Sequence, residues 1–414
     1  MKHYIIIYSL LALTLTSCNK WLDVSPKAQV EDTDLFSNQN GYKEALAGVS
    51  SSMVSDNTYT KNMLFGAMDV LAQVWDHTPS GYETLSDYDY SSAYSESILS
   101  AIWSNNYNAI ANVNNLLAHI DNDKNLFTHN NHAIIKGEAL ALRAMLHFDL
   151  LRCFGVSYEQ NRQMPAIPYS TTMTSKVSPQ LKVHEVAEKV LTDLKEAETL
   201  LAIDPILTGE QITEMVDNGY LLNRQVHLNY YAVKGLQARV YMWMQRFAEA
   251  LTAARVILKS GAFPWANPSL MMVGNDFAMA TEHVFALNNL NMSAMDDNFF
   301  NAETQISSFT IAPERLNSYF EPTDYRYLYQ FVTSVTGEWL CCRKYSMPKN
   351  SDIYYSNKIP LVKLGEMQLI EAECNYRLDG SGLEALNTLR EMRGLLPLTA
   401  EPADFMQELS AEYR

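Results

Sequence analysis

The chain has 414 residues and a formal net charge of −16, from 47 acidic and 31 basic side chains. This acidic balance argues against nucleic acid, whose binders need a basic surface, and against adhesion to anionic lipid headgroups. The length is ample for a large core and suggests two or more lobes.

The N-terminus has the pattern of a bacterial lipoprotein signal. A lysine is followed by an apolar run from Tyr4 to Leu15, which is too short to span a bilayer. Thr16 and Ser17 are the small residues a signal peptidase needs, and Cys18 follows them. We therefore expect residues 1–17 to be a signal peptide and Cys18 to carry acyl chains, because two or more chains anchor a protein stably. An ordinary secretory signal and an uncleaved anchor helix are the alternatives.

Helical periodicity dominates the rest of the chain. No later stretch approaches the ~20 unbroken apolar residues of a membrane-spanning helix. Apolar stripes predict helices over residues 102–120, 141–151, 186–201, 233–243, 247–259, 361–378 and 383–392. Gly155 is the stop signal of the second of them.

One helix pair has the features of a tetratricopeptide repeat. In such a repeat, small residues let two helices approach closely and aromatic residues fill the groove beside them. Ala238, Tyr241, Phe247, Ala250 and Ala254 fall near that pattern. A generic helical hairpin is the alternative.

Long polar stretches separate these helices, over 76–93, 156–180, 204–226 and 263–360. Long loops in compact proteins usually carry function. Strand-like runs near His283–Leu287 and Phe331–Val335 are too few for a major sheet. The predicted fold class is mainly α, with tetratricopeptide-like hairpins supporting a loop-rich face.

No motif for catalysis is present. The sequence lacks a G-x-S-x-G elbow, an H-E-x-x-H pair, a P-loop and a G-x-G-x-x-G turn. His129 and His132 have a metal-compatible spacing but stand in polar sequence typical of solvated side chains. Asp87 and Asp89 resemble a polar loop more than an acid/base pair, although carboxylates distant in sequence could still pair. We predict no catalytic residue, metal site or cofactor.

Aromatic residues are abundant, with 24 tyrosines and 6 tryptophans. Loop tyrosines and tryptophans offer large rigid faces for recognition, and a sugar ring has an apolar face that stacks on them. Trp103 and Trp243 lie in helical stripes and are assigned to the core. The candidate ligand-binding residues are Trp75, Asp76, Tyr82, Tyr88, Tyr90, Trp265, Trp339 and Arg343. Packing is the alternative role for each of them.

Four segments together resemble the SusD/RagB outer-membrane lipoproteins of Bacteroidetes. They are the lipidated Cys and Leu-Asp-x-x-Pro pattern over 17–26, the E-A-x-x-x-R-A-x-x-x-F-x-L helix over 137–155, the hairpin over 238–257 and the late helical pair over 359–390. The resemblance implies a helical fold of tetratricopeptide-like units with a loop-rich binding face over 18–414. The chain departs from the family by stopping at Arg414, inside an expected helix, which suggests a truncated C-terminus. Lys363 stands where the family often has arginine.

The resemblance also implies a function. It is that of a non-enzymatic lipoprotein on the outer face of the cell outer membrane, which captures glycans or, less often, peptides. It would deliver them, as a hinged lid, to a SusC-like TonB-dependent transporter barrel. A lipid-anchored glycan hydrolase and a protein-only tetratricopeptide-like adaptor are the competing interpretations.

Overall fold

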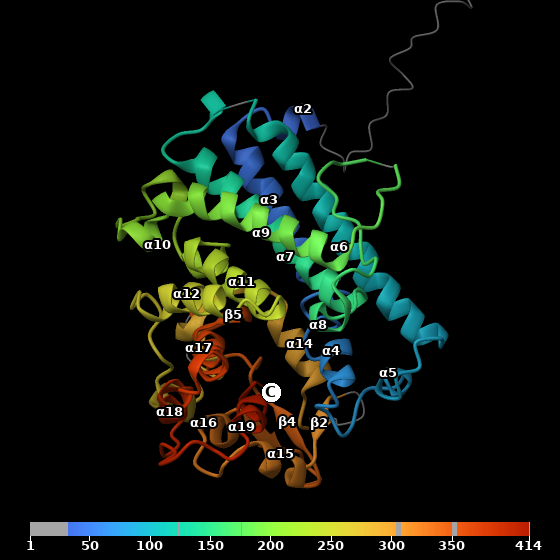
Figure 1. Ribbon diagram of the computed structural model, residues 1–414, viewed down its shortest axis with the longest axis vertical. Helices are drawn as coiled ribbons and strands as arrows, with labels where there is room; N and C mark the ends of the chain where they lie inside the picture. Colours follow the sequence, from blue (N-terminus) through green and yellow to red (C-terminus); the bar gives the residue numbers. More distant parts are fainter. Residues whose placement is uncertain (1–31, 123, 175, 304–307, 350–353, 414) are drawn as a thin grey trace, which may run out of the picture.

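The computed structural model describes residues 32–122, 124–174, 176–303, 308–349 and 354–413 (Figure 1). The predicted signal peptide and Cys18 lie outside these ranges, so the lipid-anchor prediction remains a prediction. Within the described ranges, none of the helices combines the length and the apolar character needed to cross a membrane.

The N-terminal half is a stack of long helices. Helices α3 (Gln39–Met53), α6 (Ala93–Ile120), α7 (Asn131–Phe154) and α9 (Val183–Leu200) pack in that order, each against the next (Figure 1). Helix α7 is buried on almost every side, which explains why it lacks a clear polar face. It ends at Gly155, as predicted.

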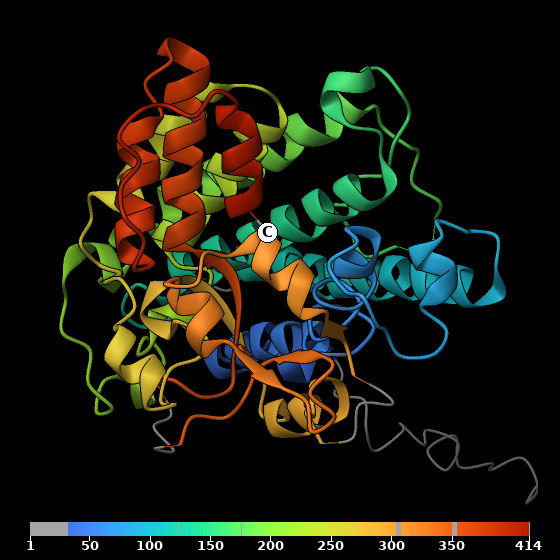
Figure 2. The same cartoon turned by 90° about the horizontal axis from the view of Figure 1, so that it is seen from below.

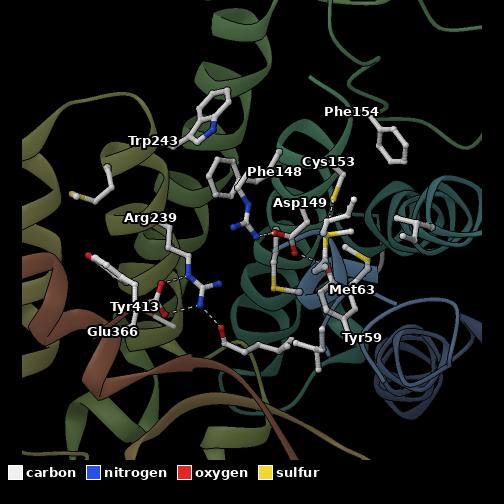
Figure 3. Close-up of a pocket in the computed structure, with 18 of the residues that line it drawn as sticks. Tyr59, Met63, Phe148, Asp149, Cys153, Phe154, Arg239, Trp243, Glu366 and Tyr413 are labelled. Carbon is white, nitrogen blue, oxygen red and sulfur yellow. Dashed lines mark hydrogen bonds and ion pairs between the residues drawn. The ribbon is translucent and has the colours of Figure 1, made fainter. Parts of the chain in front are cut away.

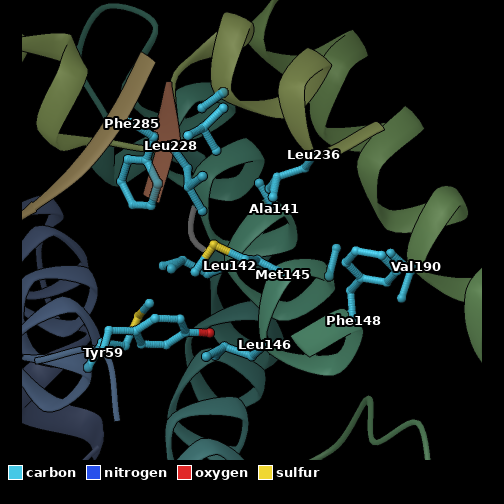
Figure 4. Close-up of a cluster of buried hydrophobic side chains, with 14 of the residues drawn as sticks. Tyr59, Ala141, Leu142, Met145, Leu146, Phe148, Val190, Leu228, Leu236 and Phe285 are labelled. Carbon is cyan, nitrogen blue, oxygen red and sulfur yellow. The ribbon is translucent and has the colours of Figure 1, made fainter. Parts of the chain in front are cut away.

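Figure 4 shows the core built around α7, in which side chains of α7 pack against side chains from the segments around it. The labelled side chains are Tyr59, Ala141, Leu142, Met145, Leu146, Phe148, Val190, Leu228, Leu236 and Phe285, all less than a tenth exposed.

The stack continues through α11 (Tyr230–Trp243), α12 (Phe247–Leu258), α17 (Leu364–Asp379) and α18 (Leu383–Met392), again with each helix against the next. Ala238, Ala250 and Ala254 are fully buried between the helices, as close helix–helix approach requires. Helix α19 (Phe405–Glu412) packs against α17, and Figure 2 shows it beside α17 and α18. The predicted mainly helical fold is confirmed.

Two small antiparallel sheets complete the fold. Strand β1 (His283–Asn288) pairs with β5 (Lys358–Lys363), with His283 opposite Lys363. Strands β2 (Thr310–Ile311), β4 (Leu340–Cys342) and β3 (Phe331–Thr333) form the second sheet in the order β2-β4-β3. The prediction that a helix begins at Leu361 is wrong. Leu361 to Lys363 complete β5, because β1 supplies their partner strand, and α17 begins at Leu364.

Short helices occupy much of the sequence predicted to be irregular, and several other connecting segments. They are α2 (Asp32–Leu35), α4 (Ala67–Leu71), α5 (Glu83–Ser86), η2 (Lys124–Leu126), α8 (Tyr158–Asn161), η3 (Leu201–Ile203), α10 (Pro205–Thr208), η4 (Asp217–Gly219), η5 (Arg224–Val226), α13 (Pro268–Met272), η6 (Ala280–Glu282), α14 (Met292–Phe299), α15 (Pro313–Tyr319) and α16 (Tyr325–Tyr329).

Buried arginine–carboxylate pairs join the layers. Arg143 of α7 donates to both carboxylate oxygens of Asp193 on α9, at 2.7 and 2.8 Å. Arg224 donates to both oxygens of Asp204, at 2.9 and 2.8 Å, and to Glu138 of α7 at 2.5 Å. These bidentate contacts fix the connection between α9 and α11 against the helical core.

Candidate functional site

A cavity of about 1040 Å³ opens where α4, α6, α7, α11 and α17 meet (Figure 3). Its size is at the upper end of the range for small-molecule sites. Its walls come from α4 and the segment before it, the N-terminal parts of α6 and α17, and the last turns of α7 and α11, so residues far apart in the sequence converge. The main lining residues are Tyr59, Met63, Met68, Tyr90, Met145, Phe148, Asp149, Arg152, Cys153, Phe154, Arg239, Met242, Trp243, Glu366, Glu373 and Tyr413.

The deeper walls are largely apolar and rich in sulfur. Methionines from the segment before α4, from α7 and from α11 line them, together with Phe148 and Phe154. Methionine is flexible and polarizable, so such walls adapt to ligands of different shape. Burial raises the pKa of the Cys153 thiol to about 11, so at neutral pH it stays protonated and is a poor nucleophile.

Two ion pairs give the cavity its polar groups. Asp149 accepts a hydrogen bond from Tyr59, at 2.6 Å, and pairs with Arg152 (Figure 3). Burial and the charge of Asp149 raise the pKa of the Tyr59 hydroxyl well above its ordinary value. The Arg152 side chain remains 46% exposed. Its guanidinium therefore has N–H groups available to a ligand.

The second pair joins α11 to α17. Arg239 of α11 donates to both carboxylate oxygens of Glu366, with Nη2 2.6 Å from Oε2, and to the carbonyl of Leu361. It thus ties α11 to the junction between β5 and α17. Because arginines hold the carboxylates of both Asp149 and Glu366, neither carboxylate is free to act as a general acid or base.

Aromatic rings stand at the edge of the cavity. Tyr90 is 51% exposed and Tyr413 is 43% exposed, while Trp243 is half-buried. Each presents part of its ring to a ligand entering the cavity. In the part of the chain that the structure describes, no group of three or more His, Cys, Asp or Glu side chains has the arrangement of a metal site. The exposed parts of the rings and of the Arg152 guanidinium suit noncovalent binding.

Several predicted ligand residues come together at one end of the molecule, around Phe309. The rings of Trp75 and Tyr82 contact Phe309, with centroids 5.8 and 5.3 Å away. Tyr82 is only 3% exposed and donates to Asn62 at 2.8 Å, so it packs in the core. Trp75 is half-buried and donates to the carbonyl of Phe65 at 2.7 Å.

Asp76 and Trp339 lie beside this cluster. Asp76 pairs with Arg315 at 2.8 Å and accepts from the backbone N–H of Ala312 at 2.8 Å, which fixes its loop to the segment after β2. The Trp339 ring is half-buried, 6.1 Å from the ring of His77. Both side chains thus hold loops in place, and only part of Trp339 faces solvent.

The remaining predicted residues are dispersed. Tyr88 is 52% exposed and donates to the carbonyl of Leu71 at 3.1 Å. Trp265 packs against the core, 5.4 Å from the Arg393 guanidinium. Arg343 stacks over Phe277 at 4.1 Å. Of the predicted set, Tyr90 alone lines the large cavity.

The comparisons with known proteins agree with this architecture. Residues 20–208 match the SusD-like family model described as "Starch-binding associating with outer membrane". The fold is similar to a SusD-like carbohydrate-binding protein from Bacteroides vulgatus, at 18% identity over 91% of this chain and 80% of that one, with a TM-score of 0.71. The chain is therefore similar to SusD-like proteins in sequence over its N-terminal half and in fold over most of its length.

Two further solved structures have the same fold. A SusD superfamily protein from Bacteroides thetaiotaomicron is 19% identical over 91% of this chain and 85% of that one, with a TM-score of 0.68. The surface glycan-binding protein A of Bacteroides uniformis is 16% identical over the same shares, with a TM-score of 0.68. No curated protein matches the sequence. The predicted resemblance to SusD/RagB proteins is confirmed.

Sequence reasoning missed most of the cavity of this SusD-like chain. Trp243 was assigned to the core from its place in a helical stripe, but it is half-buried and lines the cavity. Arg152 and Arg239 carry no distinguishing local signal, since other charged residues stand in the same helices. The Arg152–Asp149 pair lies within α7, whereas the Arg239–Glu366 pair depends on how α11 and α17 pack.

Proposed function

We propose that this SusD-like protein is a non-enzymatic glycan-binding lipoprotein of the cell surface. It captures oligosaccharides outside the cell and passes them, as a hinged lid, to a TonB-dependent transporter barrel of the outer membrane. The observation that carries the binding role is the large cavity with Tyr90, Trp243 and Tyr413 at its edge. The description of the matching family model, starch-binding and outer-membrane-associated, supports the same role.

The chemistry of the cavity favours a sugar ligand. A pyranose ring has an apolar C–H face, which stacks on Tyr90 or Trp243, and hydroxyls, which accept hydrogen bonds from the exposed guanidinium of Arg152. The carboxylates of Glu366 and Glu373 on α17 supply acceptors. Peptides are the less favoured ligands.

The anchor and the transporter partner form the finer part of the proposal. Acylation at Cys18 keeps the binding face beside the barrel, and the acidic surface of the chain keeps it off anionic headgroups. Cys18→Ala is expected to abolish surface placement and glycan uptake while leaving affinity in solution unchanged. Lost affinity in the soluble variant would contradict the anchor role. Co-purification of the wild-type protein with a barrel partner tests the delivery step.

Calorimetry against a panel of neutral oligosaccharides tests the binding role. Tyr90→Ala and Trp243→Ala are expected to weaken binding about three- to tenfold, since an aromatic stacking contact contributes about 0.5–1.5 kcal/mol. Tyr94→Ala is the matched control, because Tyr94 is 42% exposed but does not line the cavity. Binding of oligopeptides with no glycan binding would refute the proposal. Glycan turnover abolished by one Asp or Glu substitution would establish the hydrolase instead.

A further inference from the structure

A second, smaller cavity of about 390 Å³ lies next to the first, and Glu366 and Tyr413 line both. Its walls come from the segment after β4, the end of β5, α16 and the segment after α18. Four cationic side chains line it, which is unusual in a chain with a net charge of −16. They are Arg326, Lys344, Lys363 and Arg393.

The two arginines are already neutralised. Arg326 donates to Asp324 and Glu412 at 2.6 and 2.8 Å. Arg393 donates to both carboxylate oxygens of Glu282, at 2.6 and 2.7 Å. These pairs are structural contacts, and they leave little positive charge for a ligand.

The two lysines differ from them. Within the described ranges, neither Lys344 nor Lys363 makes a hydrogen bond or ion pair with a carboxylate, and both are half-buried. Lys344 lies 5.4 Å from the ring of Tyr345. The charge of Lys344, burial and the charge of Arg393 lower the pKa of Lys363 to about 7. Lys363 is therefore only partly protonated near pH 7, and an anion bound beside the two lysines would favour its ammonium form.

The cavity holds one further acidic group. Asp69 lines the wall near Lys344, and burial raises the pKa of its carboxyl to about 6 although Lys344 opposes that rise. Asp69 and the second carboxylate beside Arg326 balance the two lysine charges overall, but in the described residues neither of them makes an ion pair with Lys344 or Lys363. The remaining walls are aromatic, from Trp75, Phe320, Phe331 and Tyr345.

The contents of this cavity define a ligand with an anionic group and an apolar ring face. We propose that it binds the carboxylate of an acidic sugar, a uronic acid residue, with Lys344 and Lys363 as its counterions and the aromatic walls against its ring. This inference rests on the proposed glycan-binding function and names the sugar class. Charge-assisted hydrogen bonds to the carboxylate are shorter and stronger than those to neutral hydroxyls.

Calorimetry with trigalacturonate and with neutral galactotriose, two oligosaccharides differing in the carboxylates, tests the proposal. Trigalacturonate is expected to bind more tightly than galactotriose. Its affinity should fall as the salt concentration is raised. Lys344→Met and Lys363→Met are each expected to weaken trigalacturonate binding about tenfold or more, because a hydrogen bond to a charged group contributes about 1.5–3 kcal/mol. Lys363→Arg keeps the charge and should retain most of the affinity for trigalacturonate. Lys189→Met, on the exposed side of α9, is the control and should change nothing.

The outcomes separate this inference from the general function. The acidic-sugar inference is overturned if the two sugars bind equally, or if the lysine variants bind trigalacturonate like the wild type. Galactotriose binding that depends on Tyr90 would still leave the proposed function standing. A glutamate-rich peptide that binds with the same lysine dependence, where trigalacturonate does not bind, would also overturn the acidic-sugar inference. Thermal melting of each variant checks folding. Removing one of two repelling lysines should not lower the melting temperature.

Discussion

Replacing Arg224 with methionine should destabilise the protein strongly. The Arg224 guanidinium lies between Asp204 and Glu138, and the side chains of all three are at most 4% exposed. Methionine fills part of the space but leaves two buried carboxylates without their counterion. Breaking a buried ion pair from one side typically costs about 3–5 kcal/mol, because the abandoned charge remains desolvated.

That cost converts into a measurable shift in melting temperature. Unfolding entropy is about 2.1 cal/mol/K per residue, or about 0.8 kcal/mol/K for a chain of this size. A loss of about 4 kcal/mol therefore lowers the melting temperature by about 5 °C in differential scanning calorimetry at pH 7. The matched control is Arg246→Met, because the Arg246–Glu249 pair is 34% and 45% exposed. Such a surface pair contributes at most about 1 kcal/mol.

A double variant separates the charge effect from lost packing. In Glu138→Gln with Arg224→Met, one orphaned carboxylate is gone, so the loss should be smaller than the sum of the two single losses. If Arg224→Met melts within 1 °C of the wild type, or no earlier than the Arg246 control, this account of the buried network is wrong.

Two further predictions concern acid stability and packing. Burial alone would raise the pKa of Glu138, but the charges and hydrogen bonds of Arg224 and His227 together outweigh it and lower the pKa to about 2 from 4.5. The stabilisation from Glu138 is therefore complete above pH 4.5 and is lost as the pH falls toward 2, so urea midpoints should drop over that window and drop less in Glu138→Gln. Gly235→Ala should cost about 1–3 kcal/mol in urea unfolding, since its Cβ would lie 2.6 Å from Val362 Cγ1. Gly48→Ala, with nothing within 4 Å on an exposed helix, should instead stabilise by about 0.5–1 kcal/mol.

The helical scaffold was predictable because its signal is local. A half-buried helix needs an apolar stripe at spacings of three and four, and α9, α11, α12 and α18 carry one, so their predicted ends fall within a few residues of the observed ones. The start of α17 was missed because strand pairing is not local. Leu361 fits an apolar helical stripe equally well until β1 is known to lie beside it.

The loops were harder because composition does not report burial. Asp204 and Arg224 belong to a polar stretch that was interpreted as irregular, yet both are buried and join helices. Tyr82 and Tyr90 stand eight positions apart in one tyrosine-rich segment. The first is in the core and the second is at the edge of a cavity. Only the packing of α5 and its neighbours separates these two roles.

The use of the two kinds of basic side chain links the fold to its ligand chemistry. In the described residues, the most deeply buried ion pairs, whose side chains are at most a tenth exposed, are made by Arg143, Arg224 and Arg393. A planar guanidinium suits this task because it holds a carboxylate through two parallel hydrogen bonds. Lys344 and Lys363 line the second cavity, and neither makes an ion pair with a carboxylate of the described residues. On the proposal above, this acidic protein uses arginine for its structure and keeps two lysines at a cavity, where their charge attracts an anionic ligand.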